Sequence, residues 1–130
     1  MALLSDPALA PLFETEALAE QPVSGLVEGI VITGQIDRLR VLADEILLCD
    51  FKTNRRTPAR PEEVPVPYLR QMAAYRALLA ALYPGRPIRC ALVWTQEASI
   101  MHLPDAVLLP HAPGTYRTRA EDARPALGMA

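Results

Sequence analysis

Hydrophobic positions, mainly β-branched and aliphatic, dominate two runs of the chain, 34–42 and 45–52, on either side of a short polar turn at Ala43-Asp44. Such runs are typical of β-strands, whose side chains point to opposite faces in turn. Two such runs joined by a short polar stretch predict an antiparallel hairpin. We expect the rest of the chain to be arranged around this hairpin.

The register of the hairpin decides which side chains face one another. A turn centred between residues 43 and 44 sets Leu39 opposite Leu48 and Asp37 opposite Asp50, whereas a three-residue loop would shift every pair by one. Asp50 and Lys52 share a face in either register, because they lie two residues apart on one strand. The sequence therefore predicts an aliphatic strand face that ends in carboxylates and an ammonium group.

Weaker patterns predict the remaining elements. Pro67 suits the first turn of a helix, and apolar residues at helical spacing follow it until Pro84-Gly85 ends the pattern. The predicted elements are a short helix within 5–20 that Pro11 interrupts, strands over 21–27 and from 29 onward, a proline-rich loop over 57–67, a helix over 68–83, and strands over 87–95 and 100–103.

This order, β-β-β-α-β-β, predicts the α/β class, with a mixed sheet and one helix packed on it. A chain of 130 residues has the length of a single domain. We divide it into a short N-terminal segment at 1–19, a core at 20–109 and a tail at 110–130, which we expect to be disordered because it lacks periodicity.

Composition limits the function classes. No apolar run approaches a membrane span and the first residues lack the features of a signal peptide, so we expect a cytoplasmic protein with no membrane partner. Cys49 and Cys90 lie in apolar runs without metal-ligand spacing, which favours buried free thiols over an iron–sulfur or zinc centre. Lys52 is the only lysine, so the phosphate-binding loop of an ATPase, which needs a Gly-Lys pair, is missing.

Charge is distributed unevenly, although the formal net charge is only −2. Residues 1–50 carry nine acidic and two basic side chains, whereas residues 51–76 carry six basic and two acidic ones. Such a border could hold a phosphodiester between a metal and an arginine-lined wall, although scattered arginines are more often a solvated surface.

Asp37, Asp50 and Lys52 form the candidate site. Carboxylates opposed across a ladder are destabilising unless a positive charge lies between them, and a divalent cation is the natural candidate. Lys52 is the only lysine among thirteen basic residues, which indicates a need for a compact ammonium that a planar guanidinium would not replace. The alternative is a surface lysine paired with Asp50 on a solvated strand, and the opposed Asp37 favours the metal site over it.

Three stretches carry a family resemblance: Gly34-Gln35-Ile36-Asp37-Arg38-Leu39, Asp50-Phe51-Lys52-Thr53-Asn54 and Tyr68-Leu69-Arg70-Gln71-Met72-Ala73-Ala74-Tyr75. In this order they resemble the motifs of the PD-(D/E)XK nuclease superfamily, in its RecB-like branch. The resemblance covers roughly residues 20–105 and is greatest to the C-terminal nuclease domains of AddA-type helicase–nuclease subunits. It implies a restriction-endonuclease-like fold.

The resemblance also implies a chemistry, namely hydrolysis of DNA phosphodiester bonds that depends on Mg²⁺, with Mn²⁺ as a possible substitute. Asp37, Asp50 and the main-chain carbonyl of Phe51 would ligate the metal through oxygen. Lys52 would orient or help deprotonate the attacking water.

Further residues are expected around this centre. The resemblance implies that Gln71 and Tyr75 brace the site or guide a DNA strand. Arg55, Arg56 and Arg70 are our additional candidates for phosphate contacts, because arginines commonly bind the nucleic-acid backbone.

The implied context is double-strand break repair and recombination. The substrate would be single-stranded DNA, delivered by a helicase subunit or domain of an AddAB-like complex. The RecB-like branch also places a helix before the first strand, usually with a histidine near the metal, whereas His102 and His111 lie far downstream. We therefore expect the first helix to be reduced or missing, and we interpret the chain as a truncated fragment of the nuclease domain.

Two other hypotheses remain open. One is a catalytically inactive module that stabilises or tethers a helicase partner, in which case no metal would bind through Asp37 and Asp50. The other is an α/β binding domain unrelated to nucleases, which predicts that Asp37 and Asp50 lie apart.

Overall fold

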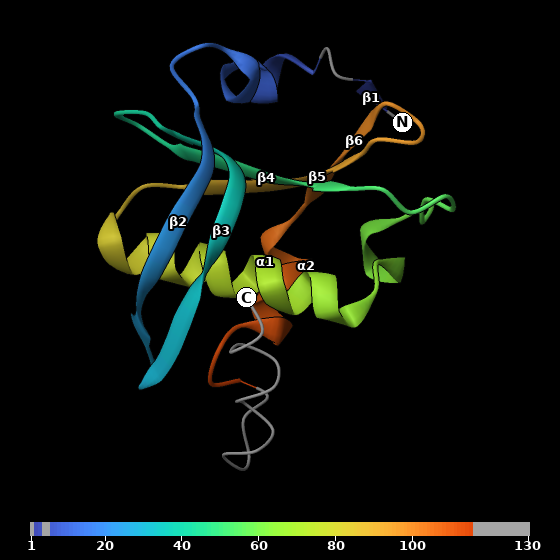
Figure 1. Ribbon diagram of the computed structural model, residues 1–130. Helices are drawn as coiled ribbons and strands as arrows, with labels where there is room; N and C mark the ends of the chain where they lie inside the picture. The colour runs from blue at the N-terminus through green and yellow to red at the C-terminus, as the bar shows by residue number, and fades with distance from the viewer. Residues whose placement is uncertain (1, 4–5, 116–130) are drawn as a thin grey trace.

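A six-stranded mixed sheet with one long helix across it forms the frame of the protein (Figure 1). The computed structural model describes residues 2–3 and 6–115. The strand order is β1-β6-β5-β4-β3-β2, in which β4 and β5 are parallel and the other neighbours are antiparallel. The strands are β1 (Ala2–Leu3), β2 (Leu18–Val27), β3 (Ile30–Val41), β4 (Ile46–Lys52), β5 (Ile88–Trp94) and β6 (Ser99–Leu103). The predicted α/β class with a mixed sheet is confirmed.

The helix α1 (Val66–Leu82) connects the parallel strands β4 and β5 and covers one face of the sheet (Figure 1). Pro67 occupies its first turn, where its missing N–H costs nothing, and Gly85 follows the helix with φ +86. Observed and predicted ends agree within two residues. The buried side of α1, including Met72 and Leu78, packs against the aliphatic face of the sheet.

The opposite face of the sheet is covered by a short 3-10 helix, η1 (Pro7–Phe13). The Asp6 carboxylate caps it by accepting the Ala8 N–H at 3.0 Å. Leu9 and Leu12 are fully buried, and they pack in a second apolar cluster with Leu47, Cys49, Ala91, Val93 and Ile100. The N-terminal segment therefore supplies the cover that α1 leaves open. Both cysteines are buried free thiols, as predicted, and burial raises the pKa of each to about 12.

Both hairpins form where the sequence predicts them. Glu28 and Gly29 connect β2 to β3 with positive φ at both positions, a turn whose twist suits neighbouring strands. In the β3–β4 hairpin Leu39 pairs with Leu48. This pair confirms the predicted register over residues 38–41 and excludes the shifted alternative.

Two short elements after β6 were not predicted. They are α2 (Asp105–Leu108) and the 3-10 helix η3 (Leu109–His111), which begins one residue before the expected tail. Leu108 is fully buried beside α1. Residues 116–130 of the predicted tail lie outside the described residues. None of the described helices is long and apolar enough to cross a membrane.

Candidate active site

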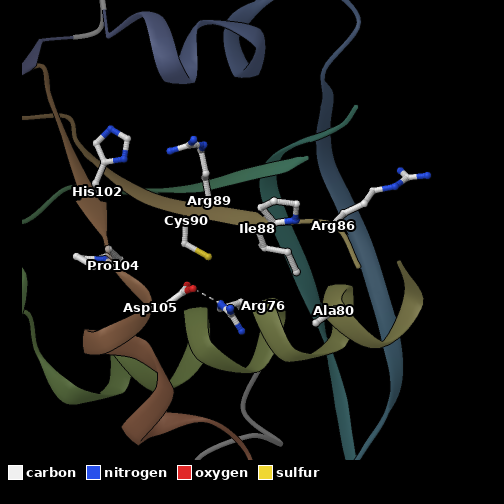
Figure 2. A pocket seen from close by; sticks show the side chains of 11 residues that line it. Arg76, Ala80, Arg86, Ile88, Arg89, Cys90, His102, Pro104 and Asp105 are labelled. Atoms are coloured by element: carbon white, nitrogen blue, oxygen red, sulfur yellow. Dashed lines mark hydrogen bonds and ion pairs between the residues drawn. The ribbon is translucent and has the colours of Figure 1, made fainter. Parts of the chain in front are cut away.

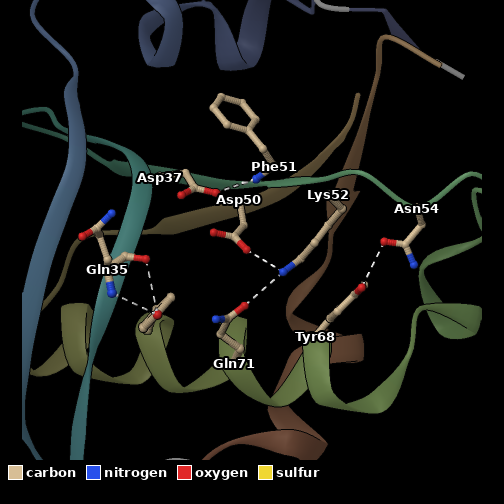
Figure 3. A network of polar contacts seen from close by, with 9 residues as sticks. Gln35, Asp37, Asp50, Phe51, Lys52, Asn54, Tyr68 and Gln71 are labelled. Carbon is tan, nitrogen blue, oxygen red and sulfur yellow. Dashed lines mark hydrogen bonds and ion pairs between the residues drawn. The ribbon is translucent and has the colours of Figure 1, made fainter. Parts of the chain in front are cut away.

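The carboxyl end of β4 brings together the acidic and basic side chains of the candidate site (Figure 3). Asp50 and Lys52 share the face covered by α1, as their spacing predicts. The Lys52 Nζ lies 2.6 Å from the Asp50 Oδ2, and only 12% and 10% of these two side chains is exposed. This ion pair therefore lies in a largely desolvated position, where electrostatic interactions are stronger than on a solvated strand.

The Asp37 side chain is held at the same strand end, but not by the ladder pair that the register predicts. The β3–β4 ladder stops at the Arg38–Cys49 pair, so Asp37 and Asp50 do not form the ladder pair that the register predicts. Instead the Phe51 N–H donates to the Asp37 Oδ2 at 2.8 Å. The carboxylate of Asp37 thus replaces a main-chain acceptor and is oriented by the strand that carries Asp50.

A local irregularity in β2 and β3 accompanies this orientation. Ile36 and Leu39 both belong to the core beneath α1 although they are three residues apart, so the alternation of faces slips between them. Glu20, at the position on β2 that would face Asp37, adopts φ +51. Asp37 lies two residues before Leu39 and shares its face by regular alternation, so the slip falls between Ile36 and Asp37.

The two carboxyl groups repel each other. The pKa of Asp50 is raised to about 6, first by burial and next by Asp37, whose carboxyl group lies within hydrogen-bonding reach of it. Lys52 acts in the opposite direction and favours the ionised form of Asp50. The Lys52 ammonium group pairs with Asp50, and a further positive charge would relieve the repulsion between the two carboxyl groups.

Three residues besides Asp50 hold Lys52. The Nζ donates to the Gln71 Oε1 at 3.2 Å and lies 4.1 Å from the centre of the Tyr68 ring. The main-chain carbonyl of Lys52 accepts two hydrogen bonds from Thr95, from its N–H at 2.9 Å and from its Oγ1 at 3.1 Å. Side chain and backbone of Lys52 are both fixed by neighbouring elements.

Tyr75 braces β3 just before Asp37. Its hydroxyl accepts the Gln35 N–H at 3.3 Å and donates to the Gln35 carbonyl at 3.4 Å. Residue 35 lies beyond the β3–β4 ladder, so the buried tyrosine satisfies main-chain groups that β4 does not reach. Burial raises the pKa of Tyr75, which keeps the hydroxyl protonated as a donor.

The three candidate arginines are not gathered in one place. Arg55 and Arg56 are exposed in a bend shortly after β4, which ends at Lys52. Arg70 is half-buried on α1. The pKa of His111 in η3 is lowered first by the burial of His111 and next by the charge of Arg70. Arg55 and Arg56 therefore lie next to the end of β4, whereas Arg70 lies near the elements at the other side of α1.

The structure adds three residues that the motif analysis did not assign to the site, namely Asn54, Tyr68 and Thr95. Tyr68 lies three residues before Gln71, on the same face of α1, and Asn54 lies two residues after Lys52, so spacing alone could have indicated both. Thr95 has no local signal, because only the parallel pairing of β5 with β4 brings it to Lys52.

The donor set fits a hard divalent cation. Within residues 2–3 and 6–115 no group of three or more His, Cys, Asp or Glu side chains is arranged to hold a metal. Asp37 and Asp50 nevertheless offer carboxylate oxygens within reach of one another, and Mg²⁺ commonly binds through one or two carboxylates together with water. The proximity of Asp37, which after burial raises the pKa of Asp50 further, favours such a cation, since its charge would offset the repulsion.

Replacing Asp37 by Asn tests this repulsion. Asparagine keeps an oxygen that can accept the Phe51 N–H, but it removes one of the two opposed charges. We expect the free energy of unfolding, measured by urea denaturation in EDTA at mildly alkaline pH, to rise by about 1 kcal/mol. The matched control, Asp44→Asn in the exposed β3–β4 turn, should leave it unchanged, and a less stable Asp37→Asn protein would contradict the assigned repulsion.

A cavity of about 470 Å³ lies at the other end of the sheet (Figure 2). It is lined by the first residues of β5, which pair with the start of β4 rather than with its carboxyl end. Two of its arginines are already paired, Arg76 with Asp105 at 3.0 Å and Arg89 with Glu45 at 2.7 Å. The cavity is therefore separate from the candidate site.

A mixed sheet with two carboxylates and a lysine at one strand end, beneath a crossing helix, is the architecture of a metal-dependent nuclease of restriction-endonuclease-like fold. The family model of the PD-(D/E)XK nuclease superfamily matches residues 5–124, and the chain belongs to this superfamily. No curated protein matches the chain significantly.

Proposed function

We propose that the protein hydrolyses DNA phosphodiester bonds with Mg²⁺ or Mn²⁺, as a RecB-like nuclease domain of an AddA-type helicase–nuclease in double-strand break repair and recombination. The observation that supports this proposal is the convergence of Asp37, Asp50 and Lys52 at the end of β4. Superfamily membership supports the nuclease class.

Each residue of the convergence has a role in the proposed reaction. Asp37 and Asp50, with the carbonyl of Phe51, would hold the metal, which when bound polarises the scissile phosphate as a Lewis acid. Asp37 is already oriented by the Phe51 N–H, at 2.8 Å. Such preorganisation reduces the reorganisation needed when charge develops in the transition state.

Lys52 holds the attacking water in this proposal. An ammonium group has three N–H donors, and Asp50 and Gln71 accept two of them. No hydrogen-bond acceptor for the third donor occurs in the part of the chain that the structure describes. This donor can therefore take a water molecule or a phosphate oxygen of the substrate.

The substrate in this proposal is single-stranded DNA delivered by a helicase subunit or domain. Arg55 and Arg56 are exposed beside the end of β4, where they can contact phosphates on either side of the scissile bond. Their contribution to DNA affinity should not depend on the DNA sequence and should decrease as the salt concentration rises.

The two rival hypotheses differ in their support. An α/β binding domain unrelated to nucleases requires Asp37 and Asp50 to lie apart, and their hydrogen-bonding proximity contradicts it. A catalytically inactive module that tethers a helicase partner keeps the same fold, and it differs only in lacking metal binding and cleavage.

Metal binding and cleavage together test the proposal. We expect Mg²⁺ to bind the purified protein in titration calorimetry, to raise its unfolding temperature, and to support cleavage of end-labelled single-stranded DNA that EDTA abolishes. Asp37→Asn and Asp50→Asn should lose the metal-dependent stabilisation, whereas Asp44→Asn should retain it. Absence of both binding and cleavage in the unchanged protein would favour the tethering module.

A further inference from the structure

We propose that Tyr68 is a positioning residue with two separable parts: its ring holds the Lys52 ammonium group, and its hydroxyl holds the segment that carries Arg55 and Arg56. The inference rests on the proposed nuclease function for its kinetic consequence. The contacts that carry it do not depend on that function.

The ring of Tyr68 lies against the charged end of Lys52. The Nζ is 4.1 Å from the ring centre, within the distance at which a cation is attracted to the face of an aromatic ring. The Lys52 side chain is only 12% exposed, so water screens this attraction little. Together with Asp50 and Gln71, the ring limits the ammonium group to one place.

The ring itself is supported from beneath. Trp94 is fully buried at the end of β5, and its ring centre lies 6.4 Å from that of Tyr68, with the planes tilted by 44°. This distance lies within the range over which two aromatic rings interact. The position of Tyr68 is therefore set by the core, and the position of Lys52 is set in turn by Tyr68.

The hydroxyl of Tyr68 has a different partner. It donates to the Asn54 Oδ1 at 3.0 Å, which ties α1 to the first residues after β4 (Figure 3). Arg55 and Arg56 follow directly in an exposed bend. The hydrogen bond therefore restricts the backbone from which both arginines extend.

A purely structural role for Tyr68 predicts a different effect of substitution. A side chain that only fills space over Trp94 could be replaced by leucine with a loss of stability and no specific effect on Lys52. The proposal instead predicts that the ring and the hydroxyl affect different measurements, which phenylalanine and leucine at position 68 can separate.

The first measurement is spectroscopic and needs neither metal nor DNA. Because Lys52 is the only lysine, protein labelled with ¹³C-lysine gives a single set of lysine signals. We expect the ε-methylene protons to be shifted upfield by the Tyr68 ring, to stay shifted in Tyr68→Phe, and to move toward random-coil positions in Tyr68→Leu. Unshifted signals in the unchanged protein, or equal shifts in both folded variants, would overturn the ring contact.

The second measurement is kinetic. We expect Tyr68→Leu to lower kcat for DNA cleavage about tenfold, as expected when an ammonium group loses a desolvated ring contact, and Tyr68→Phe to act mainly by raising KM through the lost Asn54 contact. Tyr83→Leu is the matched control, since Tyr83 also lies beside a cation, Arg86 at 5.2 Å, but at the far end of α1. A Tyr68→Leu protein with unchanged kcat would refute the positioning role.

The two measurements also separate this proposal from the proposed function. If the unchanged protein cleaves no DNA but the lysine signals show the ring shift and its loss in Tyr68→Leu, the nuclease function fails and the ring contact stands. If the protein cleaves DNA and the ring shift is missing, the nuclease function stands and the role of Tyr68 is refuted.

Discussion

Asp50→Asn is expected to lower DNA cleavage by on the order of 10³-fold, because the several kilocalories per mole that a Lewis-acid metal contributes correspond to a factor of that size. Asparagine is nearly isosteric and the carboxylate is already under strain from burial and from Asp37. The fold should therefore persist. Cleavage of end-labelled single-stranded DNA under single-turnover conditions, with circular dichroism to monitor folding, measures both effects.

A second aspartate provides the control for this substitution. Asp105 pairs with Arg76 at 3.0 Å, at the end of the sheet away from the site. Asp105→Asn removes the same charge and should leave cleavage within about twofold, since exposed ion pairs contribute little. Undiminished cleavage by a folded Asp50→Asn protein would refute the assignment of Asp50 as a metal ligand.

Lys52→Met is expected to lower kcat about 10²- to 10³-fold while metal binding persists, because a residue that orients or activates the nucleophile contributes within that range. Removing the ammonium leaves Asp37 and Asp50 without the charge that now offsets them. Mg²⁺ affinity measured by calorimetry should therefore stay the same or increase. Loss of cleavage without loss of metal binding is the result that distinguishes Lys52 from the two aspartates.

Lys52→Arg refines this test. The guanidinium keeps the charge but is planar and larger, and it would have to fit a space bounded by Asp50, Gln71 and the Tyr68 ring. We expect it to restore stability in the absence of metal more than it restores kcat. Full activity in Lys52→Arg would show that charge alone is needed and would contradict a positioned ammonium.

The two substitutions address a single electrostatic arrangement from opposite sides. Two carboxylates and one ammonium are held together by backbone contacts, from Phe51 to Asp37 and from Thr95 to Lys52. The Asp37 and Asp50 carboxyl groups repel each other, and a bound metal would relieve this repulsion. Without metal, the protein is therefore expected to be less stable than a variant in which one of these side chains is replaced by its neutral amide. Stability and activity therefore respond in opposite directions at Asp37 and Asp50.

Local patterns in the sequence determined the elements and the face on which the chemistry lies. A strand period of two places Asp50 and Lys52 together in any register, and the polar turn sets the Leu39–Leu48 pair that the structure confirms. Pro67 and Pro84-Gly85 locate the ends of α1 within two residues. These features depend on a few neighbouring residues, so they can be derived without knowing the fold.

The two short elements after β6 have no local pattern that predicts them. The segment Asp105–Leu108 is too short to show a helical period, whereas η1, a 3-10 helix that contains Pro11, lies within the short helix predicted over 5–20. The burial of Leu9 and Leu12 depends on a sheet face formed by β4 and β5, far along the chain. Short elements of this kind are stabilised by tertiary contacts rather than by their own periodicity.

The sequence by itself determined that Asp37, Asp50 and Lys52 belong to two neighbouring strands, that a helix with Gln71 and Tyr75 follows them, and that the chain has the order of motifs of its superfamily. Only the tertiary structure decided how they meet. Asp37 accepts the Phe51 N–H instead of forming a ladder pair, and Thr95, directly after β5, and Tyr68 of α1 fix Lys52. The physical reason is that strand period and turns are local, whereas desolvation and contact partners depend on segments that only folding brings together.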